Sequence, residues 1–180
     1  AKGATPNEDG IYGFAKVMPS WLKNKLFQKS ILNQNLIKIL GKKIKWNEKI
    51  LFSEHHLSHA ASAFYPSPYD CAAILILDGV GEWATTSLAV GNQNKIKIMK
   101  EIYFPHSLGL LYSAFTYYLG FKVNSGEYKV MGLAPYGRPI YTNIIYEKLI
   151  STRADGSFQL DMSYFDYSTG FTMTSKKFNK

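Results

Sequence analysis

The sequence predicts an α/β protein in which a mixed sheet is flanked by helices. Leucines at helical spacing precede Gly41, whereas short apolar runs separated by glycine and asparagine turns follow residue 50. The 180 residues, 46% of them apolar, can bury one sizeable core, which excludes intrinsic disorder. No run approaches the roughly 20 consecutive apolar residues that a membrane-spanning helix requires.

Residues 1–49 form the first predicted domain, a lysine-rich helical segment. Nine lysines and one acidic residue, Glu48, lie between Lys16 and Lys49, and the rest of the chain is neutral. The leucine spacing predicts one long helix or two short ones that end at Gly41. A solvated helix face or an acidic neighbour is the favoured interpretation of the charge. Nucleic acid or an anionic membrane surface is the alternative, although no arginine is present in this segment to read bases.

The second predicted domain, residues 50–180, carries the strands. Residues 50–52 predict a short strand, and the alanine-rich residues 54–64 predict a helix that Pro66 stops. The continuous apolar run 72–77 predicts a strand covered on both faces, with Cys71 buried beside it. The later elements are strands at 84–90 and 95–103 joined by a turn at 91–94, helices at 108–119 and 127–133, a turn at 135–137, a helix from 140 to 150 and an irregular tail.

Three of the four histidines lie within five residues, just after the first predicted strand. On a helix, His55 and His59 stand one turn apart on the same face, so they can share a metal ion. A polar surface pair is the competing interpretation, and two imidazoles need further ligands from elsewhere. His56 points in another direction, toward packing or toward a partner of the ligands. Glu54 precedes the pair, so the zinc-protease motif HExxH is disfavoured.

The segment Asp-Gly-Val-Gly at 78–81 follows one predicted strand and precedes another. Rossmann and P-loop phosphate sites are therefore rejected, because both place the phosphate at a helix N-terminus. Glycines in a hairpin can instead let backbone N–H groups approach an anion, while Asp78 reaches a metal or its bound water. A tight turn capped by Asp78 is the alternative.

Two further polar features stay open between function and structure. Glu127 and Lys129 lie in the glycine-containing segment 124–137, where they could orient a ligand or pair with neighbours. His106 could belong to an active site or only contact the N-terminus of the following helix. The residues themselves assign no catalytic group.

Four blocks of the sequence, residues 54–64, 77–86, 104–112 and 125–137, resemble the O-carbamoyltransferase family of nodulation and antibiotic-tailoring enzymes. The blocks occur in the family's order. The resemblance implies that residues 50–180 are part of an actin/sugar-kinase-like (ribonuclease H-like) nucleotide-binding fold. It also implies that carbamoyl phosphate and ATP form carbamoyl-adenylate, with release of pyrophosphate, and that the carbamoyl group passes to a hydroxyl of a small-molecule acceptor.

The resemblance also implies roles for individual residues. His55 and His59 would bind a divalent metal ion, iron being the expected one, with Asp78 beside it directly or through water. Asp78, Gly79 and Gly81 would form the phosphate loop that meets ATP. The family's N-terminal phosphate hairpin, remote aspartate ligand and carbamoyl-phosphate-binding arginines have no match in these residues. We therefore expect an internal fragment of such an enzyme, inactive alone, with the remainder of the enzyme as its partner.

Two other functions stay open. The chain could be a regulatory or interaction module that keeps the fold without turnover. A relative of the tRNA threonylcarbamoyl transferases is disfavoured, because their phosphate loop usually reads Ser-Gly-Gly where this chain has Asp78, Gly79 and Val80. The single cysteine excludes an internal disulfide and fits a reducing compartment, so a cytoplasmic protein is expected.

Overall fold

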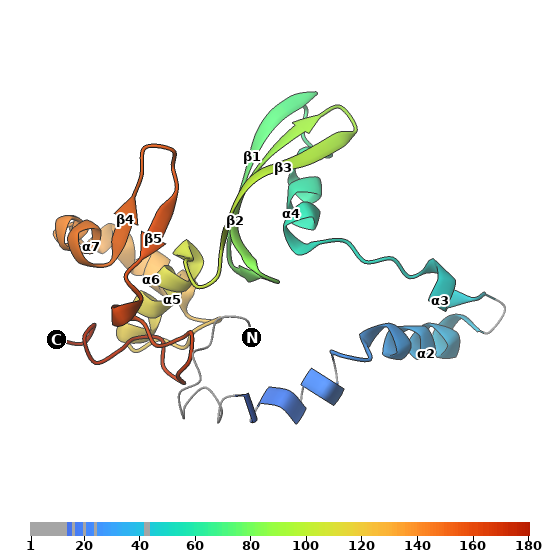
Figure 1. Cartoon of the computed structure of the whole chain (residues 1–180), viewed down its shortest axis with the longest axis horizontal. Coiled ribbons are helices and arrows are strands. Elements are labelled where there is room, and N and C mark those ends of the chain that lie inside the picture. Colours follow the sequence, from blue (N-terminus) through green and yellow to red (C-terminus); the bar gives the residue numbers. More distant parts are fainter. Residues whose placement is uncertain (1–13, 16, 20, 24, 42–43) are drawn as a thin grey trace. The chain divides into compact units, whose positions relative to one another are not determined.

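The computed structural model describes residues 14–15, 17–19, 21–23, 25–41 and 44–180 (Figure 1). These residues divide into two compact units, one ending at Ser53 and the other comprising Glu54–Lys180. The predicted domain boundary between residues 49 and 50 stays a prediction. Among the residues described, no helix is long and apolar enough to cross a membrane.

The first unit contains α2 (Gln28–Leu40) and the short α3 (Trp46–Lys49). A turn at 25–27 separates α2 from helical residues at 21–23, and α2 ends before Gly41, whose φ of 87° few other residues adopt. The predicted end of a helix at Gly41 is thereby confirmed. The predicted strand at 50–52 is wrong, because that backbone is irregular and pairs with no strand of the described chain.

The second unit is built on a three-stranded sheet of β1 (Cys71–Gly81), β2 (Ala84–Asn92) and β3 (Lys95–Tyr103). The strands follow one another in space as in sequence, and each pairs with the next antiparallel. Two-residue connections after Gly81 and Asn92 permit no other direction. The α/β class is confirmed, but the described sheets are antiparallel rather than mixed.

Helix α4 (His55–Phe64) covers one face of this sheet (Figure 1). Alternate residues of β1 point toward it, so Ile74 and Ile76 are buried against Ala60 and Phe64. Ala60 is fully buried, and its small side chain lets the helix lie close to the strands. This packing brings the first turns of α4 alongside the end of β1.

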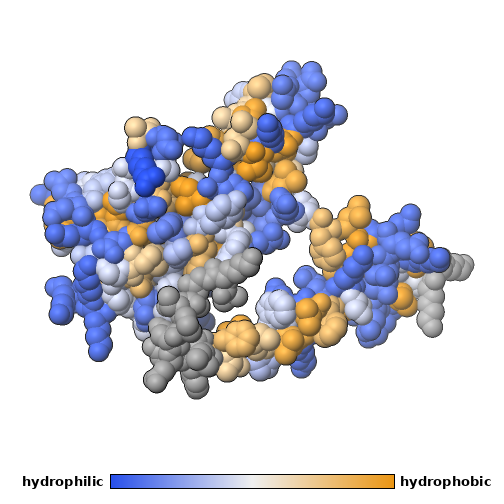
Figure 2. Space-filling model, viewed as in Figure 1, coloured by the Kyte–Doolittle hydropathy of each residue, from blue (hydrophilic) through white to orange (hydrophobic). Residues whose placement is uncertain are grey.

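The other face of β1 is exposed, which corrects the prediction of a strand covered on both faces. Leu75 is 63% exposed and Leu77 is 54% exposed, and Cys71 is exposed on the same alternation. The space-filling view shows hydrophobic side chains on the visible surface of the sheet (Figure 2). A continuous apolar run does not reveal which of its two faces a helix will cover.

The rest of the second unit consists of short helices, one small hairpin and an irregular tail. Its elements are α5 (Leu108–Tyr118), α6 (Glu127–Leu133), a 3-10 turn (Ala134–Tyr136), α7 (Thr142–Lys148), β4 (Ile150–Thr152), β5 (Phe158–Leu160) and a second 3-10 turn (Met162–Tyr164). A second core joins Ala114 of α5 to Leu149, Leu160 and Phe165. This hairpin was not predicted, and it lies almost entirely in the segment predicted to be an irregular tail. Strands of three residues are too short to show the alternation by which a strand is recognised in a sequence.

Candidate functional site

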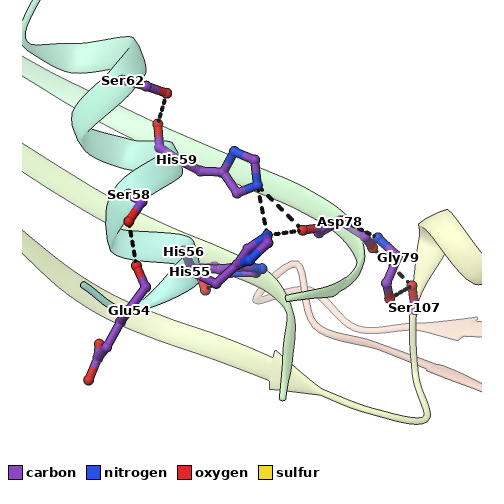
Figure 3. Close-up of polar contacts among 10 residues, drawn as sticks. Glu54, His55, His56, Ser58, His59, Ser62, Asp78, Gly79 and Ser107 are labelled. Carbon is purple, nitrogen blue, oxygen red and sulfur yellow. Dashed lines mark hydrogen bonds and ion pairs between the residues drawn. The ribbon is translucent and has the colours of Figure 1, made fainter. Parts of the chain in front are cut away.

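Two imidazoles and one carboxylate converge at the contact between α4 and β1. His55 Nε2 lies 2.8 Å from Asp78 Oδ2, and His59 Nε2 lies 2.9 Å from His55 Nε2 and 3.4 Å from the same Asp78 oxygen. Figure 3 shows the three side chains pointing toward one another. We call these residues the His–His–Asp cluster. It is the set of side chains that could hold a metal ion within the described part of the chain.

The local fold explains this convergence. The i,i+4 spacing on α4 places the two histidine rings one turn apart on one helix face, with ring centroids 4.7 Å apart. The β1–β2 register shifts between Leu77 and Gly81, so the strand is irregular where Asp78 lies. Side-chain exposures of 41% for His55, 52% for His59 and 28% for Asp78 leave the cluster open to solvent.

The charges of the cluster favour a cation at its centre. Burial acts to raise the pKa of Asp78, but the hydrogen bond from the Gly79 N–H and the neighbouring histidines together lower that pKa below its ordinary value. Asp78 is therefore ionised at neutral pH. When the ring protons of His55 and His59 are on Nδ1, both Nε2 atoms offer a lone pair, and these two atoms together with Asp78 Oδ2 could coordinate one cation.

The chain matches the family described as "Carbamoyltransferase N-terminus" over residues 5–180. The chain belongs to this carbamoyltransferase family. Its resemblance to the O-carbamoyltransferases, carried by the four blocks of sequence, is thereby confirmed.

Three curated relatives show how much of a longer protein the chain spans. It is 59% identical over 169 residues to "Uncharacterized protein sll1178" of Synechocystis sp., which covers 94% of this chain and 28% of that protein. It is 41% identical over 112 residues to nodulation protein NolNO of Sinorhizobium fredii, covering 62% of this chain and 16% of that protein. It is 35% identical over 144 residues to "Uncharacterized protein MJ1058" of Methanocaldococcus jannaschii, covering 72% of this chain and 23% of that protein. The chain thus spans less than a third of the length of these relatives.

The two glycines predicted for the phosphate loop of this carbamoyltransferase chain have different surroundings. The Gly79 N–H donates to Asp78 Oδ1 at 2.6 Å, and the space where its Cβ would lie is open. A Cβ on Gly81 would instead lie 2.7 Å from the His55 ring and 2.5 Å from the His56 ring. Gly81 therefore provides room for histidines, and phosphate binding by either glycine stays a prediction.

Ser107 and Gly109 hold the backbone beside the cluster, and the sequence reasoning missed both. Ser107 Oγ lies 3.0 Å from the carbonyl oxygen of Asp78 and 2.7 Å from that of Gly79, while it accepts the Leu110 N–H at the start of α5. A Cβ on Gly109 would lie 2.7 Å from the Asp78 carbonyl oxygen. The sequence did contain a signal for Ser107, because serine is a preferred N-cap and this serine precedes the predicted start of a helix. Gly109 follows it by two residues.

His56 lies behind the cluster, as its predicted direction away from the other two rings requires. It is 4% exposed, and its Nδ1 lies 2.5 Å from Ser87 Oγ on β2. Burial lowers the pKa of His56 and outweighs the attraction of Asp78, so the ring is neutral at neutral pH. Ser87 and its neighbour Glu101 carried no signal in the sequence, because their partners come from other elements.

The remaining candidates have structural partners. His106 Nδ1 accepts the Leu160 N–H at 3.1 Å, and burial lowers the pKa of His106. Glu127 accepts the Asn124 N–H at 2.9 Å and the Ser113 hydroxyl at 3.0 Å. For Glu127 the structure therefore supports pairing with neighbours. His106 instead bonds to β5, not to the N-terminus of the following helix that its structural alternative predicted.

Proposed function

We propose that the whole protein is an ATP-dependent O-carbamoyltransferase. Carbamoyl phosphate, water and ATP would give carbamoyl-adenylate, phosphate and pyrophosphate, and the carbamoyl group would then pass to a hydroxyl of a small-molecule acceptor. Membership of the carbamoyltransferase family supports the reaction class. A small-molecule acceptor is proposed from the resemblance to the nodulation-type O-carbamoyltransferases, and one relative of the chain is named a nodulation protein. We further propose that residues 50–180 contribute to an actin/sugar-kinase-like nucleotide-binding fold in the cytoplasm.

The observation that carries this proposal is the His–His–Asp cluster. Metal–ligand bonds of about 2.1 Å at right angles place neighbouring donor atoms about 3.0 Å apart. The three donor atoms lie 2.8, 2.9 and 3.4 Å from one another, so they fit one shared ion. Two imidazoles and one carboxylate with open positions are typical of a ferrous site. We therefore propose that His55, His59 and Asp78 hold a divalent metal ion, with iron as the expected metal.

The chain's own residues would prepare the site for ATP. A divalent ion would neutralise charge on the phosphate oxygens and fix their positions. Asp78 is ionised and aimed at the cluster by the Gly79 N–H, and Ser107 holds the backbone of this turn. The open space at Gly79 would admit a phosphate group next to the cluster. The exposed side of both histidines leaves room for ligand atoms from the substrates.

Substituting Asp78 in the whole protein tests this function. Asp78→Asn keeps the side-chain shape but removes the negative charge, so we expect a folded protein whose pyrophosphate release from ATP and carbamoyl phosphate falls by orders of magnitude. The control is Ser58→Ala on α4, the helix that carries both histidines; the Ser58 hydroxyl bonds only to the Glu54 carbonyl among the hydrogen bonds described. Normal turnover by Asp78→Asn would return this residue to the role of a turn cap. Absence of turnover in the unsubstituted protein would favour a non-catalytic module.

A further inference from the structure

A hydrogen-bond chain runs behind the His–His–Asp cluster and touches none of the donor atoms in it. Tyr103 donates to Glu101 Oε2 at 2.6 Å, Ser87 lies 3.1 Å from Glu101 Oε1, and Ser87 Oγ lies 2.5 Å from His56 Nδ1. Ser87 and Glu101 are directly opposite each other in the β2–β3 register, so the sheet itself holds them together. We propose that this chain fixes His56 as the Nδ1-protonated tautomer and thereby positions His55 for metal binding.

The direction of the chain follows from counting protons. Ser87 Oγ donates to Glu101 Oε1, and a serine has only one hydroxyl proton to donate. Ser87 Oγ must then accept from His56, which places a proton on His56 Nδ1.

Burial of the ring gives the same tautomer independently. His56 Nε2 is buried and has no hydrogen-bond partner among the residues that the structure describes. A proton there would be a buried donor without an acceptor, which is costlier than a bare lone pair against carbon. Ser87 itself is fully buried, so water does not compete for the contact between the two side chains.

Gly81 connects the orientation of His56 to that of His55. The point where a Cβ on Gly81 would lie is 2.5 Å from His56 Cδ2 and 2.7 Å from His55 Cδ2, so both ring edges border the same glycine. A rotation of the His56 ring would change the space left for the His55 ring, whose Nε2 is one of the three donor atoms. Ser87 and Glu101 are accordingly positioning residues, and only this second half of the inference rests on the proposed metal site.

The experiment compares two serines that make the same kind of contact. Ser113 is also buried and donates to a glutamate, Glu127, at 3.0 Å, but it lies on α5 outside the cluster. Ser87→Ala and Ser113→Ala each remove a buried hydroxyl that donates to a glutamate, and only Ser87→Ala also removes a contact with His56. Glu101→Gln is the conservative variant, because its amide oxygen still accepts from Ser87.

Two readouts are measured on the chain and its variants: ¹⁵N shifts of the His56 ring nitrogens without metal, and affinity for Co²⁺ by optical titration. We expect a protonated Nδ1 in the unsubstituted chain, in Ser113→Ala and in Glu101→Gln. In Ser87→Ala we expect averaged tautomers and Co²⁺ affinity reduced about tenfold.

A protonated Nε2 in the unsubstituted chain would overturn the inference. The inference would also be overturned if Ser87→Ala and Ser113→Ala gave the same ¹⁵N shifts of the His56 ring and the same affinity for Co²⁺. Absence of Co²⁺ binding by both the chain and the whole protein would refute the proposed metal site and with it the positioning of a metal ligand by His56, whereas the ¹⁵N shifts would still decide the tautomer.

Discussion

At Gly81 the absence of a side chain makes room for two histidine rings, whereas the space beside Gly79, two residues earlier on β1, is open. Gly81→Ala would place a methyl group against the His55 and His56 rings. We therefore expect the affinity of the chain for Co²⁺ to fall at least about tenfold. The substitution His59→Ala, which removes a proposed metal ligand, should reduce the affinity at least as much. Gly79→Ala is the matched control and should bind Co²⁺ as the unsubstituted chain does. Equal affinities for the two alanine variants would show that Gly81 does not set the ring positions.

Glu127 gives a prediction for pH at the same scale. The pKa of Glu127 lies below its ordinary value of 4.5. The main cause is the hydrogen bond that its carboxylate accepts from the Asn124 N–H. Hydrogen bonds from Ser113 and from the N–H groups of Glu127 and Gly126 add to this effect, and together they outweigh burial. A carboxyl with a lowered pKa stabilises the fold above its unfolded-state pKa, and this stabilisation is lost as pH falls through the folded-state pKa. The free energy of unfolding of the chain should therefore exceed that of Glu127→Gln at pH 7, with the difference shrinking below pH 4.5. Urea unfolding at several pH values measures this, and a pH-independent difference would contradict it.

At the scale of elements, α5 approaches the end of β1 through Gly109. A Cβ on Gly109 would lie 2.7 Å from the backbone of Asp78 and Gly79, which cannot move aside as a flexible side chain can. We expect Gly109→Ala to destabilise the chain by about 1–3 kcal/mol, the range for overpacking. Gly132→Ala, on α6 with open space at its Cβ, should instead stabilise it by about 0.5–1 kcal/mol through helix propensity. Thermal or urea unfolding compares the two, and effects of the same sign would refute the close approach of α5.

The strand β1 shows what element-level patterns can and cannot predict. Its apolar run correctly predicts a strand, because β-branched and aliphatic residues fit a pleated surface. The burial of Ile74 and Ile76, with exposure of Leu75 and Leu77, depends on which face α4 covers. Every residue of the run is apolar, so the sequence contains no alternation that would mark the covered face.

At the scale of the whole molecule, the chain spans 28% of its Synechocystis relative. Binding of a nucleotide loses most of its free energy when a large part of the contacting surface is absent. We therefore expect the 180-residue chain by itself to transfer no carbamoyl group and to gain little thermal stability from ATP. The whole protein should show both ATP-dependent transfer and stabilisation. ATP-dependent transfer by the 180-residue chain alone would mean that these residues contain the complete site.

Structural features that depend on neighbours along the chain could be predicted from the amino-acid sequence alone. Helical spacing places His55 and His59 on one face of α4, because the pitch of a helix requires it. The four family blocks were equally readable, and the family match supports them. Strands β1 to β3 and the turns between them followed from apolar runs and turn residues, which act over a few residues, whereas β4 and β5 did not.

Contacts between side chains that are far apart in the sequence could be identified only from the tertiary structure. Asp78 is 23 residues from His55 in the sequence, and Ser87 is 31 residues from His56, yet both pairs are in contact. These contacts depend on the register of an antiparallel sheet and on how closely a helix with a buried alanine can lie against it. Register and packing distance result from the free energy of burying the whole core, and no local pattern of residues specifies them.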